Sequence, residues 1–329
     1  MTRHTDPERG NIGPLEVFDG DVKRVLVLAD SEKADVTRLL EDLLPWLSAR
    51  VSHVDVERNL RAFCDESEGL GRPCVDELPD VIVVLGGDGS ILASVRAFTA
   101  KPVPTLGINF GRIGFLASIR VGDWEPALDE VLAGRAVIEP RMRLSAEFES
   151  RNGSPVSAVA LNEVVVARGA TQGMLTLSLS VGEQWVTDYR ADGLIVATPS
   201  GSTAHSLAAG GPILAPSMTG LVVTPICPQS LSHRPIVEHP GSVLRITVER
   251  SSGLVTMAVD GQGHFPMFEG DRAVVRAHPT PFPLLARPDS NPYRRVRERL
   301  GWRGSFEPGP EVGSAKQPEQ ARHTQGENL

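Results

Sequence analysis

The feature that most restricts the fold of this chain is an apolar run that passes directly into a glycine-rich turn. Residues 81–85 read VIVVL, GGDGS follows at 86–90, and the apolar residues of 91–98 then fall on one helical face. This order predicts a strand, a tight turn and a helix. Because glycine lets the backbone approach an anion while the N–H groups of a helix start point at it, the segment predicts phosphate chemistry.

A carboxylate lies inside this turn. Asp88 would repel a phosphate unless a metal ion or a proton-donating hydroxyl lay between them. Neither a G-x-x-x-x-G-K-S/T loop nor a G-x-G-x-x-G fingerprint is present, so the most familiar nucleotide-binding motifs do not explain the turn. Taken alone, the turn leaves two readings open, a catalytic one and a purely structural one.

The first part of the chain alternates short apolar runs with helical patterns. We expect strands at residues 22–28, 51–56, 81–85 and 103–108, and helices at residues 32–49, 90–100 and 123–133. Apolar strands separated by helices predict a doubly wound α/β domain with a parallel sheet covered on both faces. Ligands of such domains bind beyond the carboxyl ends of the strands, where the GGDGS turn lies.

The later part of the chain has a different pattern. From residue 144 to about residue 275, short segments alternate apolar and polar side chains, and a helical pattern is limited to residues 202–209. This predicts a mainly antiparallel β domain. We therefore expect a disordered tail at 1–20, an α/β domain at 21–140, a β domain at 141–290, a short helical segment at 291–303 packing on the first domain, and a disordered tail at 304–329.

Composition restricts the partners. Lys and Arg number 33 against 41 Asp and Glu, giving 33 − 41 = −8, and no dense basic run is present, which disfavours nucleic-acid binding. The three cysteines lack paired spacing, which indicates a reducing, cytoplasmic location, and Cys227 in its apolar run is expected to be an inert buried thiol. Neither a signal peptide nor an apolar run of about 20 residues is found, so no membrane partner is expected.

Three further polar segments adjoin apolar runs. Asn162 and Glu163 follow the run 159–161, and Arg190 and Asp192 precede the run 194–197. That run continues into TPSGST at 198–203, where hydroxyls and glycine opening a short helix suit a phosphate or a ribose. A structural cluster that caps the helix is the alternative.

Several segments occur together in a characteristic order. They are GGDGS, GINFGRIGFL, LNE, RADGLIVATPSGSTAHSLAAGGPI, HRP, VDGQ and RERLGW. In this combination the chain resembles the NAD kinase family from about residue 22 to residue 302. The resemblance implies an α/β domain that carries the catalytic and phosphate-donor groups, then a β-sandwich domain that binds NAD, with the active site between them.

The resemblance also implies roles for individual residues. Asp88 is similar to the family's catalytic aspartate, which takes the proton from the adenosine-ribose 2′-hydroxyl of NAD, and Gly89 lies beside the ligand. The phosphate-donor turn would comprise Gly86, Gly87, Asp88, Gly89 and Ser90. The other NAD contacts implied are Asn162 and Glu163 at the diphosphate and ribose, Arg190 and Asp192 at the nicotinamide end, Thr203, Ala204, His205, Ser206, Leu207 and Ala208 on the adenine side, and Gln262.

The implied reaction is phosphorylation of NAD to NADP, with ATP, another nucleotide or polyphosphate as donor. The resemblance implies Mg²⁺ held through the phosphates and near Asp88, with no protein ligand assigned directly, and a homodimer or homotetramer. The chain departs from the family pattern at Ser90, at Ala93, where relatives carry a basic residue, at His205, where tyrosine is common, and at Gln229, where histidine is usual. Two alternatives remain: a catalytically silent NAD or NADP sensor, and a GGDG-type sugar or lipid kinase.

Overall fold

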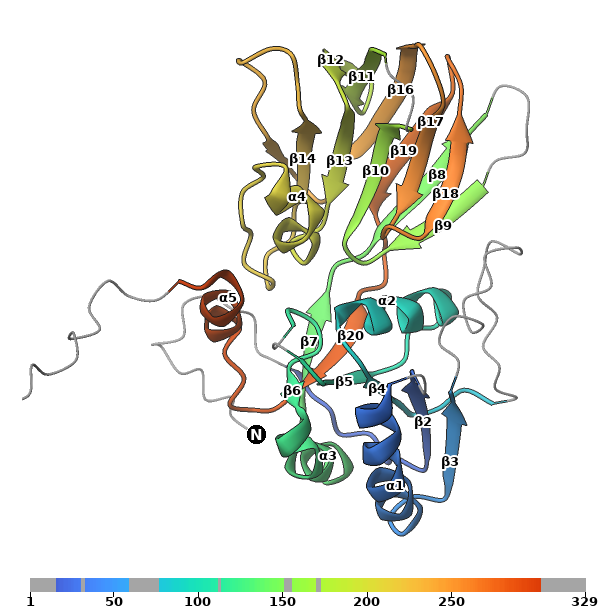
Figure 1. Cartoon of the computed structure of the whole chain (residues 1–329), viewed down its shortest axis with the longest axis vertical. Coiled ribbons are helices and arrows are strands. Elements are labelled where there is room, and N and C mark those ends of the chain that lie inside the picture. The colour runs from blue at the N-terminus through green and yellow to red at the C-terminus, as the bar shows by residue number, and fades with distance from the viewer. Residues whose placement is uncertain are drawn as a thin grey trace, which may run out of the picture.

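The structure is a computed structural model that describes residues 16–30, 33–58, 77–111, 114–150, 156–169 and 173–302. Figure 1 shows two layered parts, with an α/β part below and an all-β part above. Most of the tail expected at 1–20 and all of the tail expected at 304–329 lie outside the described residues. The segment 16–20 corrects the first expectation, because Glu16–Val17 forms strand β1 and Phe18 is buried in the core.

The lower part is built on one mostly parallel sheet. Its order is β1-β7-β20-β5-β4-β2-β3, with β6 paired to β5, and only the β1–β7 and β7–β20 pairs are antiparallel. The strands are β2 (Arg24–Ala29), β3 (His53–Glu57), β4 (Val81–Leu85), β5 (Thr105–Asn109), β6 (Ile119–Arg120), β7 (Val137–Arg141) and β20 (Phe282–Ala286). A doubly wound parallel sheet is thereby confirmed.

Helices cover both faces of this sheet. Along β4 the side chains alternate, so that Val83 and Leu85 join the core beneath α1 (Ala34–Ser48) and α3 (Trp124–Leu132). Ile82 and Val84 point to the opposite face, where they pack with α2 (Asp88–Ala97). Because every residue of β4 is buried, its run of apolar residues follows from its central place in the sheet.

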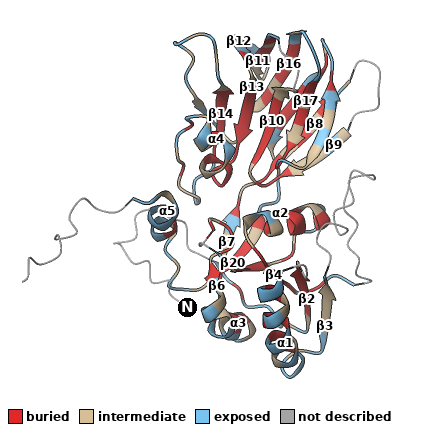
Figure 2. Cartoon of the chain, in the orientation of Figure 1, coloured by how far each residue is buried: buried red, intermediate tan, exposed pale blue. Residues whose placement is uncertain are grey.

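The upper part is a sandwich of two antiparallel six-stranded sheets, β15-β14-β13-β10-β17-β18 and β12-β11-β16-β19-β8-β9. Figure 2 shows its buried core between the sheets. The first sheet comprises β10 (Glu163–Arg168), β13 (Gly193–Ala197), β14 (Leu221–Ile226), β15 (Ile236–Glu238), β17 (Val255–Val259) and β18 (Gly263–Met267). The second comprises β8 (Leu144–Glu149), β9 (Val156–Ala160), β11 (Leu175–Val181), β12 (Gln184–Ala191), β16 (Val243–Ser251) and β19 (Arg272–Ala277).

The chain returns to the lower sheet after the sandwich. Strand β20 lies within the range 141–290 but pairs with β5 and β7, so a boundary at residue 290 does not follow the sheets. Helix α5 (Pro292–Leu300) comes next and is capped by Asn291, whose side chain accepts hydrogen bonds from the N–H groups of Tyr293 and Arg294. Within the described segments, no helix is long and apolar enough to cross a bilayer.

Candidate active site

Asp88 is the first residue of α2, three residues beyond the end of β4. Its carboxylate accepts three backbone hydrogen bonds from the loop before β6: from Phe115 N to Oδ2 at 3.0 Å, and from Leu116 N and Ala117 N to Oδ1 at 3.0 and 2.9 Å. A carboxylate has about four acceptor sites, so one site remains for a ligand. The three donors fix the orientation of the side chain.

Gly114 allows this loop to approach the carboxylate. A Cβ atom at this position would overlap Oδ1 of Asp88 and would lie 2.7 Å from its Cγ. The N–H of Gly114 donates to the carbonyl of Ala117 at 3.1 Å, which closes the loop on itself. Gly114, the second glycine of the GRIGFL segment, is therefore required because a residue with a side chain would not fit beside Asp88.

A second carboxylate holds the Asn162–Glu163 loop in the same manner. Asp260 is buried, and its oxygens accept from Leu161 N and Asn162 N, both at 2.8 Å, and from Glu163 N at 3.0 Å. Its backbone has a φ of 49° in the turn between β17 and β18, and burial raises the pKa of its carboxyl group. Of the VDGQ segment, Gln262 was expected at the site and Asp260 was not. The aspartate before a turn glycine indicates the turn itself, but it gives no sign of contacts 97 to 99 residues away.

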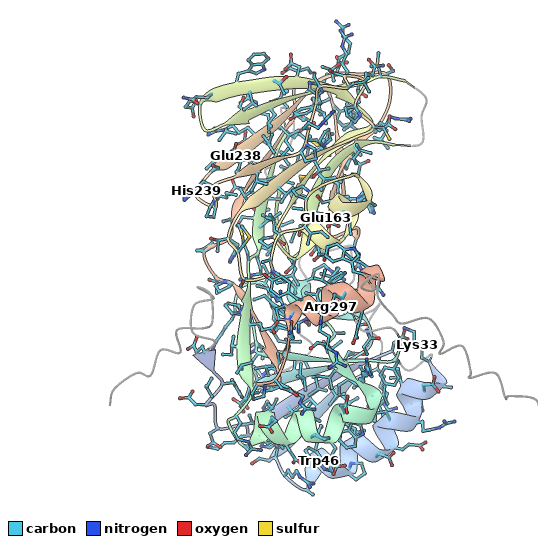
Figure 3. The ribbon with its side chains drawn as sticks, turned by 90° about the vertical axis from the view of Figure 1, so that its left-hand side faces the viewer. Lys33, Trp46, Glu163, Glu238, His239 and Arg297 are labelled. Carbon is cyan, nitrogen blue, oxygen red and sulfur yellow. The ribbon has the colours of Figure 1, made fainter. Side chains whose placement is uncertain are left out.

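Glu163 is buried beside Asp260, and its Oε2 has no hydrogen-bond partner. Burial, with a contribution from the charge of Asp260, raises its pKa to about 8, and a backbone hydrogen bond from His205 opposes the rise. Its carboxyl group is therefore mostly protonated at neutral pH and can donate an O–H to a ligand. Figure 3 places Glu163 where the sandwich meets the lower domain.

The hydroxyl groups of the TPSGST segment mainly donate hydrogen bonds to backbone carbonyls of the protein itself. Thr198 Oγ1 donates to the carbonyl of Leu161 at 2.6 Å, Ser202 Oγ donates to that of Pro199 at 2.6 Å, and Thr203 Oγ1 donates to that of Ser200 at 2.9 Å. These hydroxyls therefore have a structural role, although neither the 3₁₀ turn nor α4 has a side-chain cap hydrogen bond, so the expected helix-capping cluster is not what is found. The expected helix at 202–209 is a 3₁₀ turn at Gly201–Thr203 followed by the short helix α4 at His205–Ala208.

This segment nevertheless lies against the Asn162 loop. The N–H of Thr198 donates to the carbonyl of Asn162 at 2.8 Å. A Cβ atom at Gly201 would lie 2.5 Å from the carbonyl carbon of Asn162. The fold therefore groups the predicted residues Asn162, Glu163, Gln262 and the segment 203–208 at one end of the sandwich.

Arg190 and Asp192 are not part of this group, since Arg190 lies near the end of β12 and Asp192 lies between β12 and β13. Asp192 precedes β13, and its Oδ1 pairs with Arg168 Nε at 2.7 Å. Glu163 pairs with Ala197, at the far end of the β10–β13 strand pair and four residues beyond Gly193. At about 3.3 Å per residue, about 15 Å therefore separates Asp192 from Glu163. Within one chain the structure therefore keeps Asp192 apart from Glu163.

Cys227 and Gln229, which follow β14, are both exposed. The expected burial of Cys227 is wrong, because β14 ends at Ile226 and the backbone turns with a φ of 46° at the cysteine. The Gln229 side chain donates from Nε2 to Met174 Sδ at 2.9 Å. Of the other departures, Ala93 is buried on α2 and His205 is exposed.

Packing and charge connect the two carboxylate-held loops. Leu161, next to Asn162, belongs to the same core cluster as Ile91 and Leu92 of α2. Arg96, near the other end of α2, contributes a charge that stabilises the buried carboxylate of Asp260. The helix that begins at Asp88 therefore contacts the loop that presents Asn162 and Glu163.

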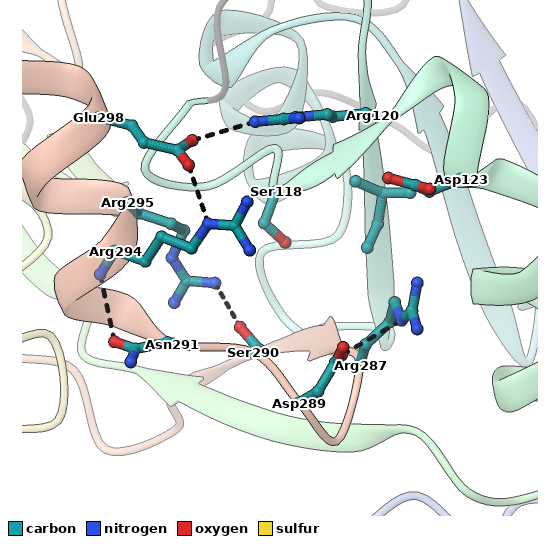
Figure 4. A pocket seen from close by; sticks show the side chains of 11 residues that line it. Ser118, Arg120, Asp123, Arg287, Asp289, Ser290, Asn291, Arg294, Arg295 and Glu298 are labelled. Atoms are coloured by element: carbon teal, nitrogen blue, oxygen red, sulfur yellow. Dashed lines mark hydrogen bonds and ion pairs between the residues drawn. The ribbon is translucent and has the colours of Figure 1, made fainter. Parts of the chain in front are cut away.

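A separate pocket of about 150 Å³ lies between α5, β6 and the end of β20 (Figure 4). Its arginines are paired: Arg120 and Arg294 with Glu298 at 3.3 and 2.8 Å, and Arg287 with Asp289 at 3.2 Å. Arg295 also lines it, and this side chain is bound to Glu139 at 2.7 Å. Because each cation already has a carboxylate partner, the pocket is not a strong anion site.

No group of three or more His, Cys, Asp or Glu side chains suited to a metal ion is found among the described residues. Asp88 retains about one acceptor site, so it can supply one oxygen ligand. Mg²⁺ commonly binds through one or two carboxylates, substrate phosphates and water. The residues present therefore fit a magnesium ion that arrives with a phosphate donor.

The arrangement is that of a phosphotransferase built from two domains, because the glycine turn and the carboxylate lie together at one strand end and face a polar loop of the second domain. Comparisons with known proteins agree. The ATP-NAD kinase N-terminal domain profile matches residues 25–136, and the C-terminal domain profile matches residues 161–286. The chain belongs to the NAD kinase family.

Individual relatives cover most of the chain. The NAD kinase of Pseudomonas entomophila is 40% identical over 279 residues, 84% of this chain and 93% of that protein. The NAD kinase of Desulforamulus reducens is 38% identical, over 83% and 96%. Among solved structures, yeast NADH kinase complexed with NADH has a TM-score of 0.76 at 25% identity, over 88% of this chain and 91% of that one. An Archaeoglobus fulgidus NAD kinase in complex with ATP has a TM-score of 0.65 at 26% identity, over 84% and 99%.

Proposed function

We propose that this enzyme transfers the γ-phosphoryl group of ATP to the adenosine-ribose 2′-hydroxyl of NAD, forming NADP and ADP. The observation that carries the proposal is the carboxylate of Asp88, fixed by three backbone donors with about one acceptor site left. One of the structural relatives is complexed with NADH and the other with ATP, which supports the choice of substrates.

In the proposed reaction, Asp88 accepts the proton of the ribose hydroxyl. The hydroxyl oxygen forms a bond to the γ-phosphorus, the bond from that phosphorus to the bridging oxygen breaks, and ADP leaves with the electron pair. Such a reaction needs mainly in-line positioning and stabilisation of charge. A positioned base contributes typically about 10²–10⁴-fold to the rate.

The glycines of the turn leave room for phosphates. No atom lies within 4 Å of a Cβ built at Gly87 or at Gly89, so both face open space. The free N–H groups at the start of α2 favour negative charge there. A magnesium ion held through the donor phosphates, near Asp88, would neutralise charge on the donor, and the remaining acceptor site of Asp88 would stay available for the ribose hydroxyl.

The loop at Asn162 and Glu163 is proposed to hold NAD. The protonated Glu163 can donate a hydrogen bond to a phosphate or ribose oxygen, which an ionised carboxylate could not do. Residues 203–208 are proposed on the adenine side. The roles of Arg190, Asp192 and Gln262, the use of polyphosphate, a cytoplasmic location and a homodimer or homotetramer stay predictions.

The test is product formation by the purified protein supplied with NAD, Mg²⁺ and, in separate reactions, ATP, another nucleotide or polyphosphate. The proposal expects NADP with at least ATP. A silent sensor would bind NAD without forming NADP. A sugar or lipid kinase would consume ATP only when given a different acceptor.

A further inference from the structure

Two segments cross between the lower sheet and the sandwich. Residues 142–143 lead from β7 to β8, and residues 278–281 lead back from β19 to β20 (Figure 1). The two crossings run antiparallel, because β7 pairs with β20 on one side of them and β8 pairs with β19 on the other. Between these pairs the N–H of His278 donates to the carbonyl of Arg143 at 2.8 Å. The two crossings therefore form a narrow two-stranded connection between the domains.

The side chain of Arg143 binds the returning crossing and the segment that follows α2. It is fully buried, and its Nε donates to the carbonyl of Thr280 at 2.8 Å, while Nη1 donates to that of Thr99 at 2.9 Å. Its Nη2 lies 3.2 Å from Nδ1 of His278, which is also 3.1 Å from the backbone nitrogen of Thr280. Because a guanidinium and a backbone N–H only donate, Nδ1 accepts both bonds and carries no proton.

Among the described residues, the partner atoms of this guanidinium are neutral: two carbonyl oxygens and one imidazole nitrogen. Burial lowers the pKa of Arg143 to about 10, which leaves the side chain charged at neutral pH. Replacing a buried ionic group by an apolar side chain of similar size is often neutral or stabilising. Stability is therefore a weak reason for an arginine here, whereas its three hydrogen bonds to two distant segments define a geometry.

The segments joined by Arg143 lead to both parts of the site. Thr99 follows α2, the helix that begins at Asp88, and its hydroxyl donates to a carbonyl of the last turn of that helix at 2.8 Å. On the other side, Leu144 adjoins Arg143 and pairs with the last residue of β9, two residues before Asn162. Arg143 therefore connects the helix that carries the carboxylate with the strand pair that leads to the NAD loop.

We propose that Arg143 is a positioning residue for the phosphoryl transfer: by binding the end of α2 and the returning crossing, it sets the place of the NAD loop relative to Asp88. The inference rests on the roles proposed above for Asp88 and for the loop at Asn162 and Glu163. Asp88 belongs to the lower domain and the loop belongs to the sandwich, so in-line attack requires a fixed angle between the domains. A misplacement of about 1 Å can lower a rate about a hundredfold.

A purely structural clamp is the competing explanation. In that case the contacts of Arg143 would only stabilise the connection, and their loss would lower stability while the folded enzyme kept its turnover. The two explanations therefore differ in kcat measured on folded protein, with the affinity for NAD determined separately.

The experiment compares four variants of the full chain. Arg143→Lys keeps the positive charge, but a compact ammonium group cannot reproduce the fork that reaches all three acceptors. Arg276→Lys is its matched control, because Arg276 of β19 pairs with Glu147 of β8 inside the sandwich, two residues before the crossing. His278→Leu removes the acceptor Nδ1, and His278→Asn is nearly the same size as His278→Leu but supplies an amide oxygen as acceptor.

Each protein is assayed for kcat with NAD, ATP and Mg²⁺, for NAD affinity by direct binding, and for folding by circular dichroism. We expect kcat to fall about tenfold to a hundredfold in Arg143→Lys and about threefold to tenfold in His278→Leu, with NAD affinity within about fivefold. His278→Asn and Arg276→Lys should stay within about twofold of the parent in kcat. Equal kcat values for folded Arg143→Lys and Arg276→Lys would overturn the inference. If Arg143→Lys does not fold, the two His278 variants decide, and equal kcat values for them overturn it.

Asp88→Asn, assayed in parallel, separates this inference from the proposed function. If Asp88→Asn loses turnover while folded Arg143→Lys and His278→Leu keep theirs, only the inference about Arg143 is wrong. If Asp88→Asn keeps its turnover, the role of Asp88 is wrong, and the inference that depends on it is wrong as well.

Discussion

Gly114 lies so close to Asp88 that a Cβ atom on the glycine would be 2.7 Å from the carboxylate carbon and would overlap Oδ1. All three of the nearest atoms that such a Cβ atom would meet belong to the carboxylate of Asp88. The absence of a side chain at Gly114 therefore lets the following backbone come near enough for the N–H groups of residues 115–117 to bind the carboxylate of Asp88.

The first prediction follows from this contact. Gly114→Ala should lower kcat by about a hundredfold, because the added methyl group displaces either the loop or the carboxylate from its position, and small misplacements at a reacting group are costly. Gly122→Ala is the control, since a Cβ there meets no atom within 4 Å. Steady-state kinetics of both variants are compared; equal kcat values would show that the close approach is not required.

The second prediction concerns the carboxylate that organises the NAD loop. Asp260→Ala should lower the free energy of unfolding by about 3 kcal/mol, because three N–H groups, two of them buried and one partly buried, lose their acceptor. Urea unfolding measures the effect. Asp289→Ala, at a side chain that is 73% exposed, should leave stability nearly unchanged. A similar loss in both variants would contradict the account of the loop.

The third prediction is a pH dependence at Glu163. Its pKa is raised from 4.5 to about 8 in the folded protein, so the folded state binds more protons than the unfolded state between these values. Stability from this group is present at low pH and is lost as pH rises toward 8. Relative to Glu163→Gln, the ligand-free parent should lose on the order of 3 kcal/mol between pH 5 and pH 8.5.

Urea unfolding of the two proteins across this pH range measures the difference, because other titrating groups are common to both. Parallel stability curves would mean that Glu163 is ionised in the folded protein throughout. The hydrogen-bond donor proposed for NAD would then be absent.

The sequence predicted the position of the catalytic turn because its signals are local. The strand at 81–85, the glycines and the start of the helix are adjacent in the chain, and the structure places Asp88 at the first helical residue. The parallel sheet and the antiparallel sandwich also followed from hydrophobic patterns, which differ between strands buried on both faces and strands buried on one.

The contacts that fix the site have no local signal. Asp88 binds residues 27 to 29 positions later, and Asp260 binds residues 97 to 99 positions earlier. Pairing of β20 with β5 likewise joins segments far apart in the chain. Such contacts depend on how distant loops meet, so the role of Asp260 and the return of the chain to the first sheet could not be predicted.

The most direct test of the account is the turnover of Asp88→Asn, measured with NAD, ATP and Mg²⁺ beside NAD affinity measured by direct binding. The substitution keeps the size of the side chain and removes its ability to accept the hydroxyl proton. We predict that kcat falls by about 10³-fold or more while NAD affinity stays within about tenfold. Turnover within about tenfold of the parent, in protein that still binds NAD, would contradict the role of this carboxylate.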